Sequence, residues 1–465
     1  KDNFDFRGED GPYSQSESTG GSIRLNAALG EFELVSISAL DHWNYDIEED
    51  VDFSDLDVLG FFSADQEQGG WYSRGEISTN FYSQEFRLLS PSYDKYEYLI
   101  GLYYANAETT EYFFRNLSLA LADNDTTAKT ESLSVFGQLT WHFTSSTSIT
   151  GGLRWLNEEI SADLISYLDS VPAKVSGNDS DSPVVGRVSL QHFFGEDIMT
   201  YVSYARGYKG QAFDIGGGRF SEDAANNPID SETSNSYEIG VKSILWDRRL
   251  QLNADVFYTT YEDFQVQRTD LIDNAVVFEL DNVGELVTQG IELDSLILIG
   301  ENIALTMNAS YIDASANDYV GAACWSGQTV AQGCVAGLQD VDNGRLPVAP
   351  EWKYTAMLDY KVPLDSLPFD GFANVIYTWQ DDVIFNINQD PSLTQGGYGL
   401  TNLRFGLNDR EGRYRVTFFA NNVFDKAYAG NKINLTQLFA PGLTIGQILP
   451  RSAQRYAGVQ ARYNF

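Results

Sequence analysis

Few residues in this chain have the types and the spacing that enzymatic or metal chemistry requires. There are only three histidines, His42, His142 and His192, and they lie far apart without metal-ligand spacing. No G-x-S-x-G or H-E-x-x-H motif occurs, so the sequence predicts neither a hydrolase nucleophile nor a zinc protease site. We therefore expect no enzyme, no catalytic residue, no metal site and no cofactor, and we interpret the histidines as structural residues.

An acidic run is the one candidate for cation binding. It extends from Asp46 to Asp57 and contains Glu48, Glu49, Asp50, Asp52 and Asp55 between them. A calcium site needs several carboxylate oxygens that converge at about 2.3–2.6 Å, and the run lacks the glycine of an EF-hand loop. We favour a solvated loop, and calcium binding stays open as an alternative.

The composition is that of an all-β protein. The chain has 465 residues, of which 14% are aromatic, with 40 glycines, 3 methionines and no linker that divides it. No run approaches eighteen apolar residues, so no transmembrane helix is predicted. Thirty basic and sixty-six acidic residues give a formal net charge of −36, which argues against nucleic acid as a partner.

The carboxy-terminal stretch from Arg455 to Phe465 alternates apolar and polar residues with a period of two. Its apolar set is Phe465, Tyr463, Ala461, Val459 and Ala457. This alternation predicts a strand with one apolar and one polar face. A length close to the roughly 9–11 residues that cross a bilayer at a tilt favours a membrane strand over a strand of a soluble sandwich.

The rest of the chain repeats this pattern with two kinds of connection. Short turns are predicted at Gly30, Pro91–Asp94, Ser145–Ser146, Phe194–Asp197, Trp246–Arg249, Gly300–Asn302, Pro363–Gly371 and Asp409–Gly412. Long loops are predicted at 45–78, after Tyr104, and at 161–182, 210–233, 316–349, 382–397 and 425–453. Short turns at one end and long loops at the other are typical of a transmembrane barrel, whereas a β-propeller would show a repeat of fixed period.

The polar faces of these strands carry regularly placed charges, such as Arg187, Asp255 and Arg404, which suit a wet or plugged interior. We count about seventeen strands, and single-chain bacterial barrels usually have an even number. The strand directions also require an upward strand before the first one. We therefore expect further strands upstream, and a chain without an initiating Met or signal peptide that is a fragment or a processed product.

Five segments resemble strands of one family. They are Met199–Lys209, similar to "lYasyArGyK"; Ser236–Lys242, similar to "sYEiGlK"; Leu250–Phe264; Asn282–Leu293, similar to "NvG.a...GiEle"; and Val416–Tyr428, which contains "NvFDkaY". They occur in the family's order and are followed by an aromatic carboxy-terminus, over about residues 180–465. The chain thus resembles the carboxy-terminal β-barrel portion of the TonB-dependent outer-membrane receptors, of the siderophore-receptor type.

The resemblance implies an all-β fold, a transmembrane antiparallel β-barrel in which residues 1–465 supply about 17 of 22 strands. The family's plug domain and TonB box are not in this sequence. It implies the cell outer membrane of a Gram-negative bacterium, with outer-membrane lipid and lipopolysaccharide around the barrel. Two protein partners are implied as well: the barrel-assembly machinery, which reads Tyr463 and Phe465 as an assembly signal, and the TonB energy-transducing complex, which acts through the missing plug.

The implied function is TonB-dependent uptake of a scarce large solute, and a ferric siderophore or similar iron complex is favoured. Uptake of an oligosaccharide or another nutrient is an alternative, as is a passive pore or an adhesin-like surface barrel. Loop aromatics have no lipid to anchor them, so they are the candidate contacts for this small-molecule ligand through stacking on a flat ring. They are Tyr45, Trp71, Tyr72, Phe213, Phe220, Trp325 and Phe439.

The only two cysteines, Cys324 and Cys334, lie ten residues apart in the predicted loop 316–349. The outer surface and the periplasm are oxidising, and two exposed free thiols would be unusual there. We therefore expect a disulfide that closes this short loop and orders it, with little effect on the wall of strands.

Overall fold

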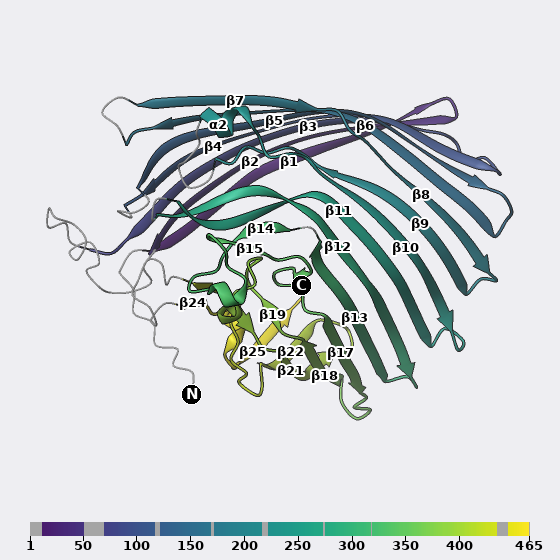
Figure 1. The fold of residues 1–465 in the computed structure, drawn as a ribbon. Coiled ribbons are helices and arrows are strands. Elements are labelled where there is room, and N and C mark those ends of the chain that lie inside the picture. Colours follow the sequence, from purple (N-terminus) through teal and green to yellow (C-terminus); the bar gives the residue numbers. More distant parts are fainter. Residues whose placement is uncertain are drawn as a thin grey trace. The chain divides into compact units, whose positions relative to one another are not determined.

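A computed structural model describes residues 12–50, 69–116, 121–168, 172–215, 222–272, 275–317, 319–434 and 445–464, and it consists almost entirely of antiparallel strands (Figure 1). No helix in these ranges has the length and the apolar character needed to cross a membrane. The chain divides into two units, each of which is described by itself.

Nineteen of the strands belong to one sheet. Strands β7 and β8 both pair with β6, and strands β16 and β17 both pair with β13. We therefore count β7 with β8 as one strand position in the sheet, and β16 with β17 as another. Across the described residues the nineteen strands therefore occupy seventeen strand positions, which confirms the predicted number of about seventeen strands.

The first unit comprises residues 1–189, 205–235 and 261–284. Its consecutive strands pair antiparallel, each with the next. They are β1 (Tyr13–Leu29), β2 (Phe32–Asp50), β3 (Tyr72–Leu89), β4 (Tyr96–Arg115), β5 (Ala122–His142), β6 (Thr147–Ser166) and β7 (Ala173–Asp181). A short helix, α2 (Glu222–Asn226), belongs to the same unit.

Five strands contribute residues to both units. They are β8 (Val184–Phe194), β9 (Ile198–Lys209), β10 (Glu232–Leu245), β11 (Leu250–Ile272) and β12 (Ala275–Ile299).

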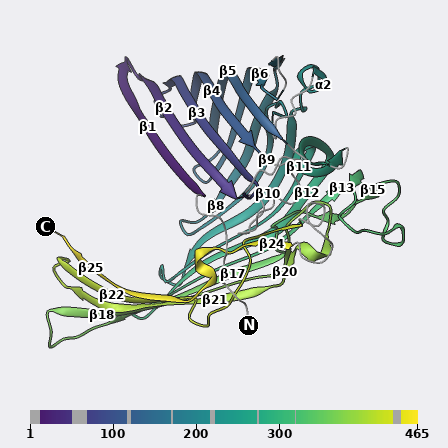
Figure 2. The same cartoon turned by 90° about the vertical axis from the view of Figure 1, so that its left-hand side faces the viewer.

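The second unit comprises residues 190–204, 236–260 and 285–465. Its remaining long strands are β13 (Ile303–Asn317), β17 (Trp352–Val362), β18 (Phe369–Gln380), β21 (Tyr398–Asp409), β22 (Tyr414–Asn421) and β25 (Tyr456–Tyr463). They pair in this order, and Figure 2 shows the last four as neighbours.

The connections of the second unit contain short elements of their own. They are β14 (Val320–Ala323), β15 (Leu338–Asp340), β16 (Gly344–Arg345), β19 (Val383–Ile384), β20 (Thr394–Gln395), β23 (Asn431–Asn434) and β24 (Ile445–Ile448), with the 3-10 helices η2 (Val330–Gln332), η3 (Pro391–Leu393) and η4 (Arg451–Ala453).

The predicted short turns are confirmed where the structure describes them. Leu29 faces Phe32 across the first turn, and Gly30 between them has a φ of 66°, which glycine adopts without steric cost. The turn between β10 and β11 holds Trp246, Asp247 and Arg248, all with positive φ. Turns of this kind fix the register, and the register fixes which side chains share a face.

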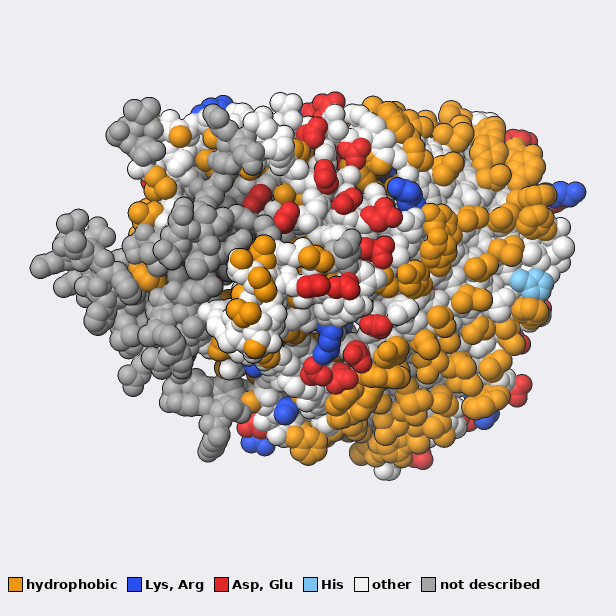
Figure 3. Space-filling view, in the orientation of Figure 1, with side chains coloured by type: hydrophobic (Ala, Val, Ile, Leu, Met, Phe, Trp, Pro, Cys, Tyr) orange, Lys and Arg blue, Asp and Glu red, His pale blue; other side chains and the backbone are white. Residues whose placement is uncertain are grey.

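The strands present an apolar outer face. Leu153 is 68% exposed on β6 and Val459 is 62% exposed on β25, as lipid-facing residues of a membrane strand would be. In Figure 3 apolar side chains gather toward the short-turn end of the strands, and acidic side chains lie further toward the other end. We call the opposite side of the sheet the inner face.

The predicted bounds of three long loops are wrong. Strand β2 runs to Asp50 and β3 begins at Tyr72, β4 continues to Arg115, and β7 occupies part of 161–182. A strand of 20 residues such as β4 spans about 65 Å, far more than the roughly 25 Å apolar band of a membrane barrel. The outer ends of these strands therefore pair through polar side chains, as Thr79 and Thr109 do at 2.9 Å. Apolar alternation does not mark that part of a strand.

Candidate functional site

The predicted loop aromatic Tyr45 lies in strand β2 and not in a loop. Its ring stacks on that of Trp43, with the centroids 5.6 Å apart and an angle of 9° between the ring planes. Trp43 also donates a hydrogen bond from Nε1 to Ser16 on β1 at 2.9 Å. Tyr45 is thus an inner-face wall residue with one ring face already covered by a neighbour.

Trp71 and Tyr72 stand at the start of β3 in different surroundings. Trp71 is buried, with 1% of its surface exposed, so its ring offers no face to a ligand in this conformation. Tyr72 is 37% exposed, and its ring centroid lies 5.6 Å from that of Phe114 on β4. Of these two residues, Tyr72 is the better candidate for a ligand contact.

Phe213 packs into a small hydrophobic cluster that fastens the β9–β10 connection to the wall. The buried members are Ala162, Leu164 and Ala225, and Phe213 lies against them. Gly177 on β7 permits this approach, since a Cβ there would lie 2.5 Å from the carbonyl oxygen of Ala225. Phe213 therefore supports the position of α2 and has little free surface for stacking.

Trp325 lies beside the disulfide in a folded loop of the second unit. Cys324 and Cys334 are bonded, with a Cα–Cα distance of 5.7 Å. The backbone N–H of Trp325 donates to the side chain of Gln328 at 3.1 Å, and Cys324 donates to the carbonyl of Gly337 at 2.9 Å. These bonds hold the Trp325 backbone in a defined conformation.

Three connections of the second unit are bonded to one another. Gln339 Nε2 donates to the carbonyls of Ala323 and Asn388, each at 2.9 Å. Arg345 forms a 2.7 Å ion pair with Asp382. Asn434 donates to the buried carboxylate of Asp390 at 2.7 Å. The segments 319–349, 382–396 and 425–434 are therefore bonded into one assembly at the long-loop end.

Phe220, Phe439 and Phe465 lie outside the described residues. Tyr463, the other residue of the expected assembly signal, is 48% exposed and stacks on Tyr414 at 4.9 Å. In the parts of the chain that the structure describes, no group of His, Cys, Asp and Glu could hold a metal ion. Part of the acidic run Asp46–Asp57 is outside those parts, so calcium binding by this run is untested.

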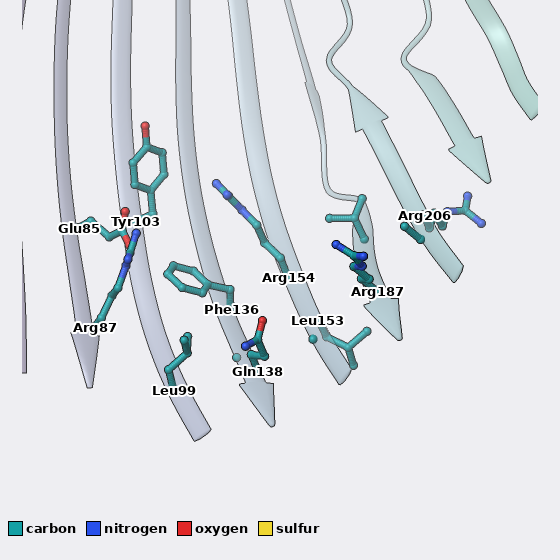
Figure 4. Close-up of a pocket in the computed structure, with 15 residues that line it drawn as sticks. Glu85, Arg87, Leu99, Tyr103, Phe136, Gln138, Leu153, Arg154, Arg187 and Arg206 are labelled. Carbon is teal, nitrogen blue, oxygen red and sulfur yellow. The ribbon is translucent and has the colours of Figure 1, made fainter. Parts of the chain in front are cut away.

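A pocket of about 510 Å³ lies on the inner face of the first unit, where strands β3 to β6, β8 and β9 meet (Figure 4). Four arginines line it, Arg87, Arg154, Arg187 and Arg206, together with a single carboxylate, Glu85. The residues that line the pocket thus carry a net positive charge, opposite in sign to the net charge of −36 on the whole chain. This local reversal of charge separates the pocket from the rest of the acidic protein.

Arg154 is the most constrained of these arginines. Its guanidinium lies over the rings of Tyr103 and Phe136, with the guanidinium carbon 5.2 Å and 6.0 Å from the two centroids, and Figure 4 shows it extending toward them. Its Nε is buried and has no hydrogen-bond partner within the described structure. Arg87 is paired with Glu85, whereas no salt bridge joins Arg154, Arg187 or Arg206 to any described carboxylate.

The register of the strands assembles this pocket. Arg87 faces Gly101, Gly101 faces Phe136, and Phe136 faces Arg154 across successive strands. Gly101 leaves room for the ring of Phe136, and the alternation of each strand directs Arg87, Phe136 and Arg154 to the same face.

Nearer the long-loop end, Glu111 on β4 lies outside the apolar band. Burial raises the pKa of its carboxyl above the usual range, since removal from water disfavours the charged form. The raised pKa of Glu111 thus reflects the packing of the strand ends.

The sequence contained a signal for the arginine pocket. Arg154 and Arg187 occupy polar positions of predicted strands, so their inward direction follows from alternation. What the sequence lacks is the register across strands, which decides whether inward arginines on different strands meet. Tyr45, Trp71, Tyr72 and Phe213, the predicted aromatics of the first unit that the structure describes, do not line this pocket.

A sheet of long antiparallel strands with an apolar outer face, short turns at one end and long loops at the other defines a transmembrane β-barrel of the outer-membrane type. The family described as TonB dependent receptor-like, beta-barrel matches residues 1–423. The chain belongs to this family, which confirms the resemblance seen in its strand motifs. Members of this family are receptors of the outer membrane of Gram-negative bacteria.

Two relatives show the range of the sequence similarity. The pesticin receptor of Yersinia pestis is 28% identical over 201 residues, which cover 42% of this chain and 28% of that receptor. The probable TonB-dependent siderophore receptor PiuA of Acinetobacter baumannii is 29% identical over 213 residues, 45% of this chain and 26% of the relative. The matches thus span less than a third of each relative's length.

Solved structures show the same fold over nearly the whole chain. The ferric yersiniabactin uptake receptor FyuA from Yersinia pestis matches with a TM-score of 0.76 at 18% identity, over 98% of this chain and 62% of that one. The siderophore receptor PiuA from Acinetobacter baumannii matches with a TM-score of 0.72 at 17% identity, over 98% and 65%. At these identities the likeness establishes the fold alone.

Proposed function

We propose that residues 1–465 are the barrel domain of a TonB-dependent outer-membrane transporter that takes up a ferric siderophore or a similar iron complex. The observation that carries this proposal is the resemblance of the wall of strands, within the TonB-dependent receptor family, to a ferric yersiniabactin uptake receptor and to a siderophore receptor. The strands and the plug that would complete the transporter lie outside this sequence, and TonB would act through that plug. The barrel-assembly machinery and lipopolysaccharide are the other proposed partners.

The long-loop end is the proposed entrance for the solute. The bonded assembly of loops in the second unit presents Trp325 in a fixed backbone conformation, and Tyr72 presents a partly exposed ring in the first unit. Rigid aromatic residues bind flat ligands at low cost in conformational entropy. Catecholate groups of an iron chelate are ligands of this kind.

Uptake of radiolabelled iron by the source bacterium tests the proposal. Deletion of the gene should abolish energy-dependent uptake of at least one ferric siderophore under iron limitation, and a strain that lacks TonB should show the same loss. Restoring the gene with Trp325→Ala should weaken uptake, whereas Trp246→Ala, in a short turn at the opposite end of the strands, is the matched control. Equal uptake of a panel of ferric siderophores with and without the gene would favour an oligosaccharide or other nutrient, or a passive pore.

A further inference from the structure

A second hollow, of about 500 Å³, lies in the wall of the second unit, where β8 to β12 run side by side (Figure 1). Alternation along each strand sets most of its lining on the outer face, where Val202, Ile239 and Val256 are exposed. Alternation places Asp255, the one carboxylate of the lining, on the inner face. The hollow is therefore an apolar depression in the surface that faces lipid.

The size of the side chains produces the depression. The backbone N–H of Ile244 donates to the carbonyl of Asp197 at 2.8 Å, and counting along β9 and β10 from this pair sets Thr200 beside Val241. Ala254 on β11 lines the same part of the hollow. These three side chains are short and only partly exposed, so their row lies lower than the row of larger residues two positions farther from the turn.

The membrane determines what fills the depression. An apolar hollow offers water few hydrogen bonds, and left empty it would deny its lining the contacts that close packing provides. Its outer face is continuous with the rest of the lipid-facing wall, so hydrocarbon chains are the molecules that reach it. Its volume lies within the range of about 300–1,000 Å³ that small-molecule sites occupy.

We propose that this hollow binds one acyl chain of a phospholipid of the periplasmic leaflet, and that the phosphoethanolamine headgroup of the same lipid rests on the two adjoining short turns. The site goes beyond the function proposed above, because it is independent of the solute that the receptor takes up. It distinguishes one bound lipid from the other lipids around the wall.

The position of the hollow along the strands selects the leaflet. Thr200 follows Asp197 of the short turn by three residues, which is about 10 Å in an extended strand. The short turns of outer-membrane barrels lie on the periplasmic side. His192, which lines the hollow, meets Phe194 edge to face with the ring centroids 4.4 Å apart, and aromatic residues of this kind mark the membrane interface.

The two short turns carry charges of both signs. Glu196 and Asp197 lie in the β8–β9 turn and Arg248 and Arg249 in the β10–β11 turn, and all four are exposed. The bond between Asp197 and Ile244 holds the turns side by side. Guanidinium groups bind a phosphate and carboxylates bind an ammonium group, so this pair of turns matches a zwitterionic headgroup. An anionic headgroup without an amine would meet the carboxylates unfavourably.

Native mass spectrometry of the protein in a mild detergent, titrated with phosphatidylethanolamine, tests the site. Ala254→Phe puts a ring into the depression and should weaken binding of one lipid by about tenfold or more, because the chain loses its contacts. Ala461→Phe adds the same ring to an exposed alanine of the outer face on β25, outside the hollow, and should bind as the wild type does. Unchanged affinity in folded Ala254→Phe would overturn the proposal.

A milder variant separates lost binding from lost folding. Heat-modifiable migration shows whether each variant is folded, and Ala254→Leu fills less of the hollow than the ring does. Ala254→Leu should weaken the binding of phosphatidylethanolamine in the same direction, and wild-type affinity of both folded variants would show that no chain lies there.

The headgroup is tested with phosphatidylglycerol of the same chains and with lipid A. Phosphatidylethanolamine should bind more tightly than either, and Arg248→Gln should weaken it by about threefold or more through the loss of a charge-assisted hydrogen bond. Arg404→Gln, which removes an inner-face charge on β21, is the control and should bind as the wild type does. Equal binding of the two phospholipids, or tighter binding of lipid A, would overturn the assignment to a phosphoethanolamine lipid of the periplasmic leaflet.

Discussion

Phe136 lies over Gly101 on the neighbouring strand, and no other residue type would leave room for it. The two residues face each other in the β4–β5 register, and a Cβ at position 101 would lie 2.2 Å from Cζ of Phe136. Since Arg154 stacks on the same ring, one glycine controls both the packing of two strands and the position of a guanidinium group.

Gly101→Ala should therefore destabilise the wall and disturb the pocket. Forcing a side chain into an occupied space costs about 1–3 kcal/mol, and the ring of Phe136 would have to move. Gly151→Ala on β6 is the matched control, because nothing lies within 4 Å of a Cβ built there. Urea titrations of folding into lipid vesicles measure both, and equal stability of the two variants would contradict the contact.

Val459 and Gln460 test the assignment of faces on the last strand. Val459 is 62% exposed on the apolar side, and Gln460 follows it on the inner side. An arginine facing lipid near the middle of the membrane costs about 2–4 kcal/mol, whereas an inward one can stay hydrated. Val459→Arg should thus reduce the free energy of unfolding of the vesicle-inserted protein by that amount. Gln460→Arg should reduce it much less. Equal losses would mean that the faces are assigned wrongly.

The disulfide should order one loop and leave the wall unchanged. Replacing Cys324 and Cys334 by serine opens a short loop, which costs about 2–3 kcal/mol of local stability in the chain-entropy description. Hydrogen exchange should rise around the Cys324–Gly337 hydrogen bond and in the neighbouring loop that Gln339 contacts, with the urea midpoint of the barrel unchanged. Two thiols titrating in unreduced, denatured wild-type protein would disprove the bond.

Glu111 should make the outer ends of β4 and β5 sensitive to pH. Burial raises its pKa above the ordinary 4.5, so the folded protein binds the proton more tightly than the unfolded chain does. Stability from this group is therefore present below pH 4.5 and is lost as pH rises through the raised pKa. Glu111→Gln should be more protected than wild type in hydrogen exchange at pH 8 and equal to it near pH 4. Glu108→Gln on the same strand is the control, and parallel pH profiles of Glu111→Gln and wild type would refute the burial effect.

The wall of strands was predictable from the sequence because each strand reports its own two faces. Leu153, Trp155 and Val459 are apolar at alternate positions because they face lipid. Turn residues such as Gly30 mark the short connections. The polar outer ends were missed, since residues such as the hydrogen-bonded Thr79 and Thr109 give no apolar signal in the sequence. The number of strands can be predicted from apolar alternation and turn residues. The length of the loops depends on where the polar strand ends stop, which these signals do not mark.

The contacts of the predicted site residues could not be derived in the same way. Trp71 and Phe213 are aromatic residues near loops, but the structure buries the first and packs the second against Leu164. Burial depends on neighbours that are distant in sequence. The arginine pocket has the same origin, because the register of three strand pairs places Arg87 and Arg154 on one face, along one pocket.

The aromatic carboxy-terminus should be required for assembly and contribute little to stability. Phe465 lies outside the described residues, while Tyr463 two positions earlier is held by stacking on Tyr414 at 4.9 Å. A terminal residue beyond the last paired position adds little packing, so Phe465→Ala should refold into vesicles with a urea midpoint close to that of the wild type. In cells, recognition by the assembly machinery precedes insertion, so the same variant should yield less heat-modifiable barrel in the outer membrane. Phe465→Trp keeps an aromatic end and is the control. Wild-type surface yield of Phe465→Ala would show that the terminal residue is not read, and a lowered urea midpoint would assign its role to stability.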